Sequence, residues 1–447
     1  MRALHDLTVA AAARAVREHQ VSAEQLARAL IERVERLDRG LRAWVSLDPD
    51  RALAEARARD RVPGAERQPL HGVPLGVKDI FDVAGSPTAA GFAPFAERIA
   101  AEDSAAVARL RAAGATILGK TVTTQFAYMD PPPTHNPWSP DCTPGGSSSG
   151  SGAAVAARMV PGALGSQTGG SVLRPAAYCG VVGLKPSYGR VSRRGVLPLA
   201  WTLDHPGVLC RTVEDAALLL QALAGPDPAD PGCSRRPADD YVAAAREPRR
   251  PRLLVLDDFL ARAQPEAQTS FERTVADLAA AGARVVRGAF PSRAETLIST
   301  HAVVMQSETA SVHRRLIEQH ADAYATRIRA YVETGLLLPA PDYVDALRLR
   351  RRLRREAHDL LARADCLLLP TVSGPAPGPD TTGDPTFQGP FSLLGLPAIT
   401  LPSALTAAGL PLGVQLVGPE FGEAALLGAA AWCEPALPPM AAPPGYG

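Results

Sequence analysis

Apolar side chains recur at three- and four-residue steps in the first part of the chain, which is typical of an amphipathic helix. Residues 22–25 have the form of a capping box, and the apolar face that follows extends to Leu37. The short apolar run 43–47 predicts a strand, and the polar segment 49–61 predicts a helix on the surface. The chain therefore opens with helices that have one short strand among them.

A second helix and strand are predicted farther along. Asp103 is a suitable N-cap for a helix that continues through Leu110 and ends at Gly114. Residues 115–118 then have the pattern of a strand. Residues 142–170 are dense in glycine and serine, which predicts loops in which the backbone approaches another group closely.

The second half alternates between short apolar runs and helical patterns. Residues 225–251 are rich in Pro, Asp and Arg and predict a surface connection between two halves. We expect a helix at 267–281, a long helical zone at 294–364 and a disordered proline-rich tail after Glu434. Buried strands are predicted at residues 252–256, 283–286, 366–369 and 398–401. Strands mixed with helices throughout imply an α/β fold in which helices cover both faces of a sheet.

Composition argues against several classes of partner. The chain has 447 residues and a net charge of +1, so bulk electrostatics favour neither a nucleic acid nor an anionic membrane. The first 20 residues lack the pattern of a secretory signal, and no run of 18 apolar residues predicts a spanning helix. Six cysteines are scattered without the spacing of a metal site or a disulfide frame. These features predict a cytoplasmic protein with reduced thiols and no metal, nucleic-acid or membrane partner.

Lysine is rare in this chain. Of 47 basic side chains only three are lysines, namely Lys78, Lys120 and Lys185. A buried lysine can lose its proton, whereas an arginine cannot. The three lysines are therefore candidates for positions at which arginine cannot serve.

Residues 114–121 match the phosphate-binding P-loop pattern, with Gly114, Gly119 and Lys120 at the required positions. Phosphate binding requires a strand, then the glycine loop, then a helix, so that backbone amides point at the phosphates. Here a predicted helix precedes Gly114, and the residues between the two glycines have the pattern of a buried strand. We therefore interpret this segment as a helix, a turn and a strand.

Residues 146–150 match the Gly-x-Ser-x-Gly turn that carries the nucleophile of α/β-hydrolases. That turn follows a central strand, but residues 135–144 contain three prolines and cannot form one. None of the nine histidines stands in a loop that marks it as a partner for Ser148. The sequence therefore does not favour a Ser–His–Asp triad.

A longer pattern favours a different serine chemistry. Two Gly/Ser-rich segments, 143–152 and 165–176, each present a serine and then continue directly into apolar runs, which a flexible linker would not do. Residues 168–171 offer consecutive backbone N–H groups with little side-chain obstruction, which suits an oxyanion beside an attacking serine. A lysine would have to supply the base.

These segments resemble the amidase-signature family. Further resemblance to its catalytic-lysine segment, to the stretch after its nucleophile and to its C-terminal strands is found at residues 72–79, 179–190, 203–207, 394–398 and 409–413. It extends from about residue 26 to about residue 427 and is weakest between 226 and 370. The resemblance implies a large mixed twisted β-sheet covered on both faces by α-helices, in a single domain. That domain would comprise an N-terminal helical region 1–65, a catalytic core 66–225 and a C-terminal half 252–434, followed by the tail 435–447.

Carried over residue by residue, the resemblance makes Ser171 the nucleophile, Ser147 a bridging serine after a cis peptide bond, and Lys78 the base. Lys78 must be neutral to accept a proton, and burial can lower a lysine pKa from about 10.4 towards about 7–8. A small-molecule amide substrate, no cofactor and no metal are implied, and a homodimer is compatible with the resemblance. The oxyanion hole would be formed by the backbone amides of Thr168, Gly169, Gly170 and Ser171.

The chain departs from the family pattern near these motifs. Gln167 stands where the family more often has an acid, and Gln125 stands where a glutamate is common, so local negative charge is lost. Leu173 occupies a position that is commonly arginine, and the arginine is Arg174 instead, as in a malonamidase-type branch that acts on small amide-bearing acids. Arg174 either clamps a substrate carboxylate or braces the Gly/Ser loops, and both interpretations stay open.

The substrate is not specified by these patterns. Tyr128, Met129 and Asp130 are expected on a loop near the acyl pocket, and together with Gln167 and Arg174 they are candidate substrate contacts. The same motifs also fit an amidotransferase subunit that releases ammonia for a partner protein, or an enzyme in which an amine captures the acyl group. A non-catalytic binding protein and a nucleotide-dependent enzyme that uses Lys120 are the alternatives from other classes.

Overall fold

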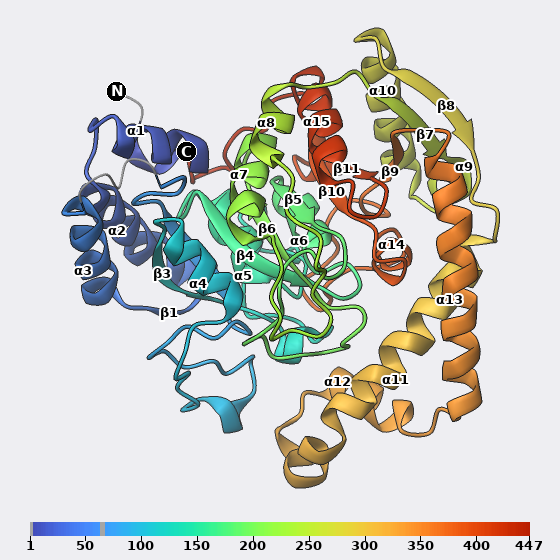
Figure 1. Cartoon of the computed structure of the whole chain (residues 1–447), viewed down its shortest axis with the longest axis horizontal. Helices are drawn as coiled ribbons and strands as arrows, with labels where there is room; N and C mark the ends of the chain where they lie inside the picture. Colours follow the sequence, from blue (N-terminus) through green and yellow to red (C-terminus); the bar gives the residue numbers. More distant parts are fainter. Residues whose placement is uncertain (1–2, 63–67) are drawn as a thin grey trace.

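One mixed sheet of 11 strands runs through the part of the chain that the structure describes (Figure 1). The computed structural model describes residues 3–62 and 68–447. Across the sheet the strands follow the order β1-β3-β2-β4-β6-β5-β10-β11-β9-β7-β8. Their bounds are β1 Trp44–Leu47, β2 Pro74–Lys78, β3 Thr116–Thr121, β4 Gly162–Gln167, β5 Val182–Lys185, β6 His205–Cys210, β7 Arg252–Leu256, β8 Arg284–Gly288, β9 Cys366–Pro370, β10 Ala398–Leu405 and β11 Pro411–Val417.

The sheet combines parallel and antiparallel pairs. Strand β2 is parallel to both β3 and β4, and β7 is parallel to both β8 and β9. The other pairs are antiparallel. All residues of β2, β4, β5, β6, β9 and β11 are buried, whereas the edge strand β8 is largely exposed. The predicted α/β fold with a large mixed sheet is therefore confirmed, and every predicted strand is present.

Helices cover both faces of this sheet, as β4 shows. Residues 162 and 165 point to opposite faces because side chains alternate along a strand. A Cβ on Gly162 would point at Val9 of α1 and Leu219 of α7, whereas one on Gly165 would point at Ser148, next to α5. The longer helices are α1 Val9–Arg17, α2 Ala23–Leu41, α3 Pro49–Asp60, α4 Ala105–Ala112, α5 Ser149–Ala156, α6 Leu173–Cys179, α7 Val213–Leu223, α8 Tyr241–Arg246, α10 Pro265–Ala280, α11 Ala294–His320, α12 Thr326–Gly335, α13 Ala340–Leu361 and α15 Glu423–Cys433. Two shorter ones are α9 Asp257–Leu260 and α14 Gly389–Leu393.

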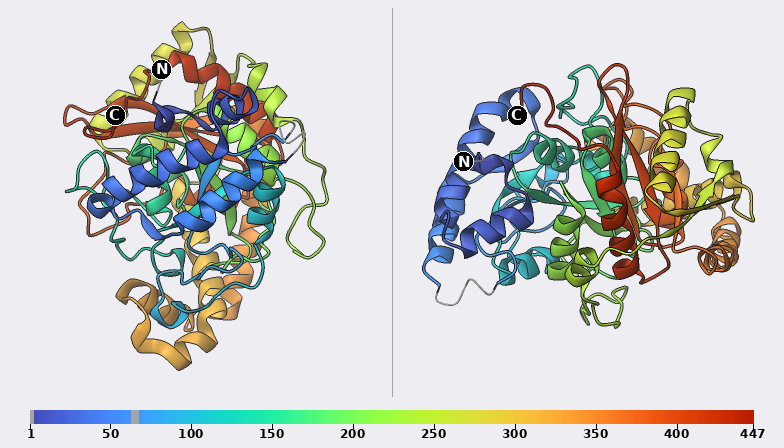
Figure 2. Two further views of the ribbon diagram at one scale, coloured as in Figure 1. Left: turned by 90° about the vertical axis from the view of Figure 1, so that its left-hand side faces the viewer. Right: turned by 90° about the horizontal axis from the view of Figure 1, so that it is seen from above.

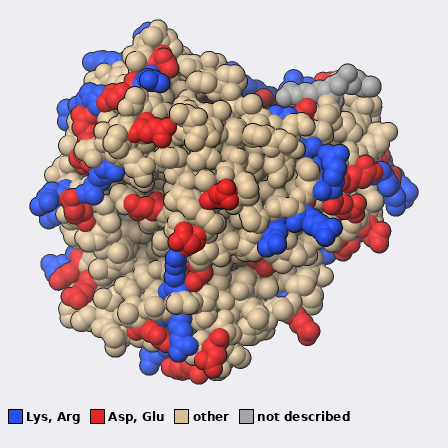
Figure 3. Space-filling model, turned by 180° about the vertical axis from the view of Figure 1, so that it is seen from behind, with Lys and Arg blue, Asp and Glu red and all other residues tan. Residues whose placement is uncertain are grey.

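Helices α11, α12 and α13 form an arm that projects from one end of the sheet (Figures 1 and 2). At the opposite end, helices α2 and α3 pack against β3, which pairs with the edge strand β1, so the predicted N-terminal region shares the sheet through β1. The predicted boundary between residues 65 and 66 lies outside the described residues. No helix within residues 3–62 and 68–447 combines the length and apolar character needed to cross a bilayer. Basic and acidic side chains are interspersed over the face drawn in Figure 3.

The N-cap of α4 differs from the prediction. Ser104, not Asp103, accepts the capping hydrogen bond, which comes from Val107 N. Asp103 instead accepts a hydrogen bond from Ala84 N at 2.8 Å and pairs with Arg111. Serine and aspartate are equally good caps by residue type, so these non-local partners decide between them.

The Gly/Ser-dense segment 142–170 is more regular than predicted, because it contains helix α5 and strand β4. Its glycines permit close packing between elements. A Cβ on Gly150 would lie 2.2 Å from Ala43 O, so no larger residue fits at this point of α5. Here the density of glycine therefore reflects close packing as well as loops.

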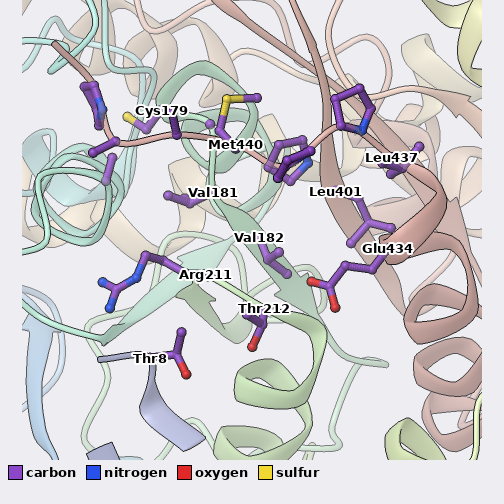
Figure 4. A pocket seen from close by; sticks show the side chains of 18 of the residues that line it. Thr8, Cys179, Val181, Val182, Arg211, Thr212, Leu401, Glu434, Leu437 and Met440 are labelled. Carbon is purple, nitrogen blue, oxygen red and sulfur yellow. The ribbon is translucent and has the colours of Figure 1, made fainter. Parts of the chain in front are cut away.

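The proline-rich tail is packed against the body, so the prediction of disorder was wrong. Leu437 is buried, and the tail covers a cavity of about 500 Å³ whose wall includes Arg211 and Glu434 (Figure 4). The physical reason is that the tail's apolar side chains find an apolar surface between β10 and the end of α6. None of the three predicted catalytic side chains lines this cavity.

Candidate active site

Lys78 is the last residue of β2 and is fully buried. Its Nζ lies 2.7 Å from Ser147 Oγ and 2.8 Å from Ser166 Oγ. Within the described part of the chain it forms no ion pair with a carboxylate. Burial holds the pKa of Lys78 well below its ordinary value; Asp204 opposes this shift and Arg174 adds to it. The site therefore favours the neutral amine.

The contacts of Lys78 suit a neutral amine, which has two N–H donors and one lone pair. Ser166 offers both its hydroxyl and, at 3.4 Å, its carbonyl oxygen as acceptors. The lone pair can then take the hydroxyl proton of Ser147. Ser166 was not among the predicted site residues, although its place in the Gly/Ser-rich segment 165–176 was a usable signal.

The turn before α5 holds Ser147 in place. The Gly146–Ser147 peptide bond is cis, as the resemblance implied. Thr124 N donates to Ser147 O at 3.3 Å, and Arg174 Nη2 donates to Gly146 O at 2.8 Å. A Cβ on Gly146 would lie 2.7 Å from Thr382 Cγ2, so glycine is needed there for space. The peptides on both sides of this serine are thus fixed by named donors.

Ser171 is 7% exposed, whereas Lys78 and Ser147 are 0% exposed. Ser148 N donates to Ser171 O at 3.3 Å, which holds the two serine segments side by side. Among the described residues no hydrogen bond joins the hydroxyls of Ser147 and Ser171. Catalytic hydrogen bonds often tighten only in the substrate complex. Ser171 is therefore the member of this trio that can meet a substrate entering from solvent.

The turn before Ser171 presents unused donors. The backbone N–H groups of Thr168, Gly169, Gly170 and Ser171, the four predicted donors, have no acceptor in the part of the chain that the structure describes. The carbonyls of Thr168, Gly169 and Gly170 are all hydrogen-bonded. Since N–H and C=O of a trans peptide point in opposite directions, the free N–H groups face away from those partners. Free donors on consecutive residues of one turn can hold an oxyanion.

Gln167 uses its amide to hold this turn. Its Oε1 accepts from Val172 N at 2.9 Å and Leu173 N at 3.0 Å, and its Nε2 donates to Ser392 Oγ at 3.0 Å. The side chain is fully buried. These contacts stabilise the first turn of α6, so they explain Gln167 without a contact to substrate.

Arg174 braces the serine segments. Its guanidinium is buried and donates through Nη2 to Gly146 O and, at 3.2 Å, to Thr382 Oγ1. The bracing interpretation is therefore realised in the structure. Nε and Nη1 are buried and have no partner among the described residues. Each of them can donate one hydrogen bond to a substrate carboxylate, as the alternative interpretation requires, but together they do not form a bidentate fork because Cδ lies between them.

The loop with Tyr128, Met129 and Asp130 is attached to the arm. The Asp130 carboxylate accepts from two backbone N–H groups in the first turn of α12, at 2.9 and 3.0 Å. The Tyr128 ring stacks on Tyr331 with centroids 4.4 Å apart, and Met129 O accepts from Arg327. Asp130 thus caps α12 with both of its oxygens, which explains its conformation without a substrate.

Gln125 is attached to the same arm. Its Oε1 accepts from Ala325 N at 2.7 Å while its Nε2 donates to Ala323 O at 3.0 Å. A carboxylate could accept the first hydrogen bond but could not donate the second. The amide at this departure from the family pattern therefore matches its partners on the arm.

The P-loop-like segment 114–121 and the Gly-x-Ser-x-Gly segment 146–150 each have a structural explanation. Lys120 lies within β3 and pairs with Asp79 at 2.8 Å, so residues 114–121 contain no phosphate loop. Ser148 Oγ contacts only backbone atoms of Ser166 within the described chain, so no histidine activates it.

Lys185 donates to the carbonyls of Pro186 and Leu396, and burial lowers its pKa to about 7.

Sequence reasoning also missed three residues that surround the turn. Asp204 accepts from Thr168 Oγ1 at 2.6 Å, and burial raises the pKa of its carboxyl to about 6. His301 and Ser392 contact the carbonyls of Thr168 and Gly169. His301 and Ser392 lie more than 100 residues away along the chain, and no local pattern marks them.

Comparison with known proteins shows the family of this chain. The family model described as Amidase matches residues 25–427. An amidase of Pseudomonas putida is 38% identical over 92% of this chain and 92% of its own length. A glutamyl-tRNA(Gln) amidotransferase subunit of Anaeromyxobacter sp. (strain K) is 37% identical over 95% of both chains. A solved structure from a protein complex connected with the origins of an s-triazine catabolic enzyme has a TM-score of 0.91 at 32% identity, and the match covers 97% of this chain and 100% of that one. The chain therefore belongs to the amidase family, the amidase-signature enzymes that hydrolyse amide C–N bonds.

Proposed function

We propose that this enzyme hydrolyses the C–N bond of a small carboxylic amide through an acyl-enzyme on Ser171. The observation that carries the proposal is the 2.7 Å contact between Lys78 Nζ and Ser147 Oγ, in a site where burial favours the neutral amine. A nucleophile that is only 7% exposed suits a small substrate better than a large one.

In the proposed reaction the Ser171 oxygen attacks the amide carbonyl carbon. Its proton passes to Ser147 Oγ, and the Ser147 proton passes to Lys78 Nζ. The N–H groups of Thr168, Gly169, Gly170 and Ser171 hold the oxyanion. Collapse of the tetrahedral intermediate breaks the C–N bond, and the proton held by Lys78 returns through Ser147 to the leaving nitrogen. Water then attacks the ester, so that a carboxylic acid is released and the Ser171 hydroxyl is restored.

An amidotransferase-type subunit is the second candidate. The 37% identity to the glutamyl-tRNA(Gln) amidotransferase chain, over 95% of both proteins, supports it. Such a subunit would release ammonia from glutamine for a partner protein. Hydrolysis of simple amides by the isolated chain, without stimulation by any added protein, would favour the plain amidase. Capture of the acyl group by an added amine would identify an amide-forming enzyme on the same acyl-enzyme.

The direct test is covalent labelling with phenylmethylsulfonyl fluoride, followed by intact-mass measurement and peptide mapping. We expect a single adduct on Ser171 in the wild type and none in Lys78→Ala, because only an activated serine reacts. Arg14→Ala, which changes a cation on α1, is the matched control and should label like the wild type. An adduct on Ser148, or equal labelling of Lys78→Ala, would contradict the proposal.

A further inference from the structure

Buried donors from distant parts of the chain hold the carbonyls of the turn before Ser171. His301 Nε2 lies 3.1 Å from Thr168 O, and Ser392 Oγ lies 2.8 Å from Gly169 O. The N–H groups of the same two peptides belong to Gly169 and Gly170. Whatever fixes these carbonyls therefore also fixes the direction of two N–H groups of the proposed oxyanion hole.

The orientation of the Gln167 amide follows from its neighbours. Two backbone N–H donors, those of Val172 and Leu173, converge on one end of the amide at 2.9 and 3.0 Å, so that end must be the oxygen. The other end is then the nitrogen, and it must donate to Ser392 Oγ at 3.0 Å. Assignment by hydrogen-bond partners is decisive here, because backbone N–H groups cannot accept.

The direction of the Ser392 hydroxyl follows in turn. Its oxygen already accepts from Gln167, so its single proton must go to a carbonyl. Two carbonyls are near: Gly169 O at 2.8 Å and Gln388 O, four residues earlier in the chain, at 3.2 Å. The shorter distance favours Gly169. All three side chains, those of Gln167, Gln388 and Ser392, are fully buried, so water does not compete.

We propose that Gln167 and Ser392 form a one-way hydrogen-bond relay that aims the Gly170 N–H at the oxyanion. The proton donors run from Gln167 Nε2 to Ser392 Oγ, and from Ser392 Oγ to Gly169 O. Gln167 and Ser392 are positioning residues, since neither is required to touch the substrate. This proposal rests on the Ser171 acyl-enzyme proposed above.

The relay depends on an amide rather than an acid at position 167. In a Gln167→Glu variant, the ionised carboxylate would keep the two backbone hydrogen bonds but would have no proton for Ser392. The Ser392 hydroxyl would then donate to the carboxylate and release Gly169 O. Protonating that acid would restore a donor and hence the relay. The variant should therefore regain function as the pH falls, which a loss of packing alone would not produce.

The test compares rates of sulfonylation of Ser171 by phenylmethylsulfonyl fluoride, because the sulfonyl oxygen gains negative charge in the hole. Ser392→Ala should react about 10- to 100-fold more slowly than the wild type, since a misdirected oxyanion donor costs up to about 10² to 10³. Gln167→Glu should be slowed similarly at pH 8. Its rate relative to the wild type at the same pH should rise by several-fold towards pH 5.

Matched controls separate the relay from general loss of structure. Ser403→Ala removes a buried hydroxyl of β10 that donates to Leu412 O in β11, and Gln268→Glu removes an amide of α10 that donates to Ala263 O. Both should be labelled at a rate within about two-fold of the wild type. The ratio of their rate to that of the wild type should not change with pH. Gln167→Glu is nearly isosteric, so it keeps the test valid if Ser392→Ala does not fold.

The possible outcomes are distinct. Ser392→Ala labelling at the wild-type rate, or a Gln167→Glu ratio that does not change with pH, would overturn the relay while Ser171 remains the nucleophile. Absence of a Ser171 adduct in the wild type would overturn the proposed function itself, and the relay would fall with it.

Discussion

Two buried lysines on neighbouring parallel strands have opposite surroundings. Lys78 on β2 contacts hydroxyl and carbonyl oxygens and has no carboxylate partner among the described residues, whereas Lys120 on β3 pairs with Asp79 at 2.8 Å. Both side chains are almost fully buried. Burial lowers the pKa of both lysines, but the Asp79 carboxylate opposes this shift at Lys120, whereas the hydroxyl and carbonyl oxygens around Lys78 carry no charge that would do so.

The largest expected difference between the two lysines is in activity after substitution by arginine. Lys78→Arg should slow sulfonylation of Ser171 by about 10³-fold or more, because arginine cannot lose its proton and so cannot act as the base. Lys120→Arg keeps a cation beside Asp79 and should stay within a few-fold of the wild type. Equal losses in both variants would show that the difference in surroundings does not matter for the chemistry.

The next effect concerns stability. Lys120→Met should lower the free energy of unfolding by about 3–5 kcal/mol, because it leaves the buried Asp79 carboxylate without its counterion. Denaturant unfolding followed by circular dichroism measures this loss. Lys78→Met removes no ion pair and replaces a poorly solvated amine, so it should cost much less. A larger loss for Lys78→Met than for Lys120→Met would contradict the comparison.

The dependence of labelling rate on pH sharpens the same contrast. Lys78 acts as a base only when neutral, so the rate should be constant above its lowered pKa and fall about tenfold per pH unit below it. An ordinary lysine would instead give a rate that still rises up to about pH 10.4. A rate that rises steadily to that pH would show that Lys78 is not perturbed.

The smallest effect is expected at Ser166. Ser166→Ala removes one hydrogen-bond partner of Lys78 Nζ and should slow labelling by about tenfold, which corresponds to about 1.4 kcal/mol for one hydrogen bond. Ser149→Ala, at a hydroxyl that contacts Val122 O instead, is the control and should change the rate much less. Equal rates for Ser166→Ala and the wild type would show that Ser166 does not orient the amine.

Much of the local structure was predictable because its causes are local. The capping box of α2 is formed by Ser22 and Gln25 as the pattern indicated, and the strands from β7 to β10 lie where apolar runs predicted them. The predictions of a disordered tail and of Asp103 as the cap of α4 were wrong because both segments make contacts with distant parts of the chain. Leu437 is buried against the body, and Asp103 is drawn away by Ala84 and Arg111.

The candidate site likewise contains residues that local motifs predicted and residues that only the folded chain reveals. Lys78 and Ser147 were predicted from motifs, and the structure places their polar atoms in contact. Ser392 and His301 reach the turn from helices more than 100 residues away, so only the folded chain reveals them. Asp130 stays a predicted substrate contact, and the structure adds that it caps α12, which no short motif could show.

The neutral state of Lys78 at physiological pH is the central claim, and the scarcity of lysine makes it directly measurable. With only three lysines in the chain, nuclear magnetic resonance of protein labelled with ¹³C and ¹⁵N at lysine gives three side-chain signals. Lys78→Arg and Lys120→Arg assign them by loss of a signal. We expect the Lys78 signal to be that of a neutral amine at pH 8 and the Lys120 signal to be that of a charged one. A Lys78 signal that stays charged up to pH 10 would contradict the account.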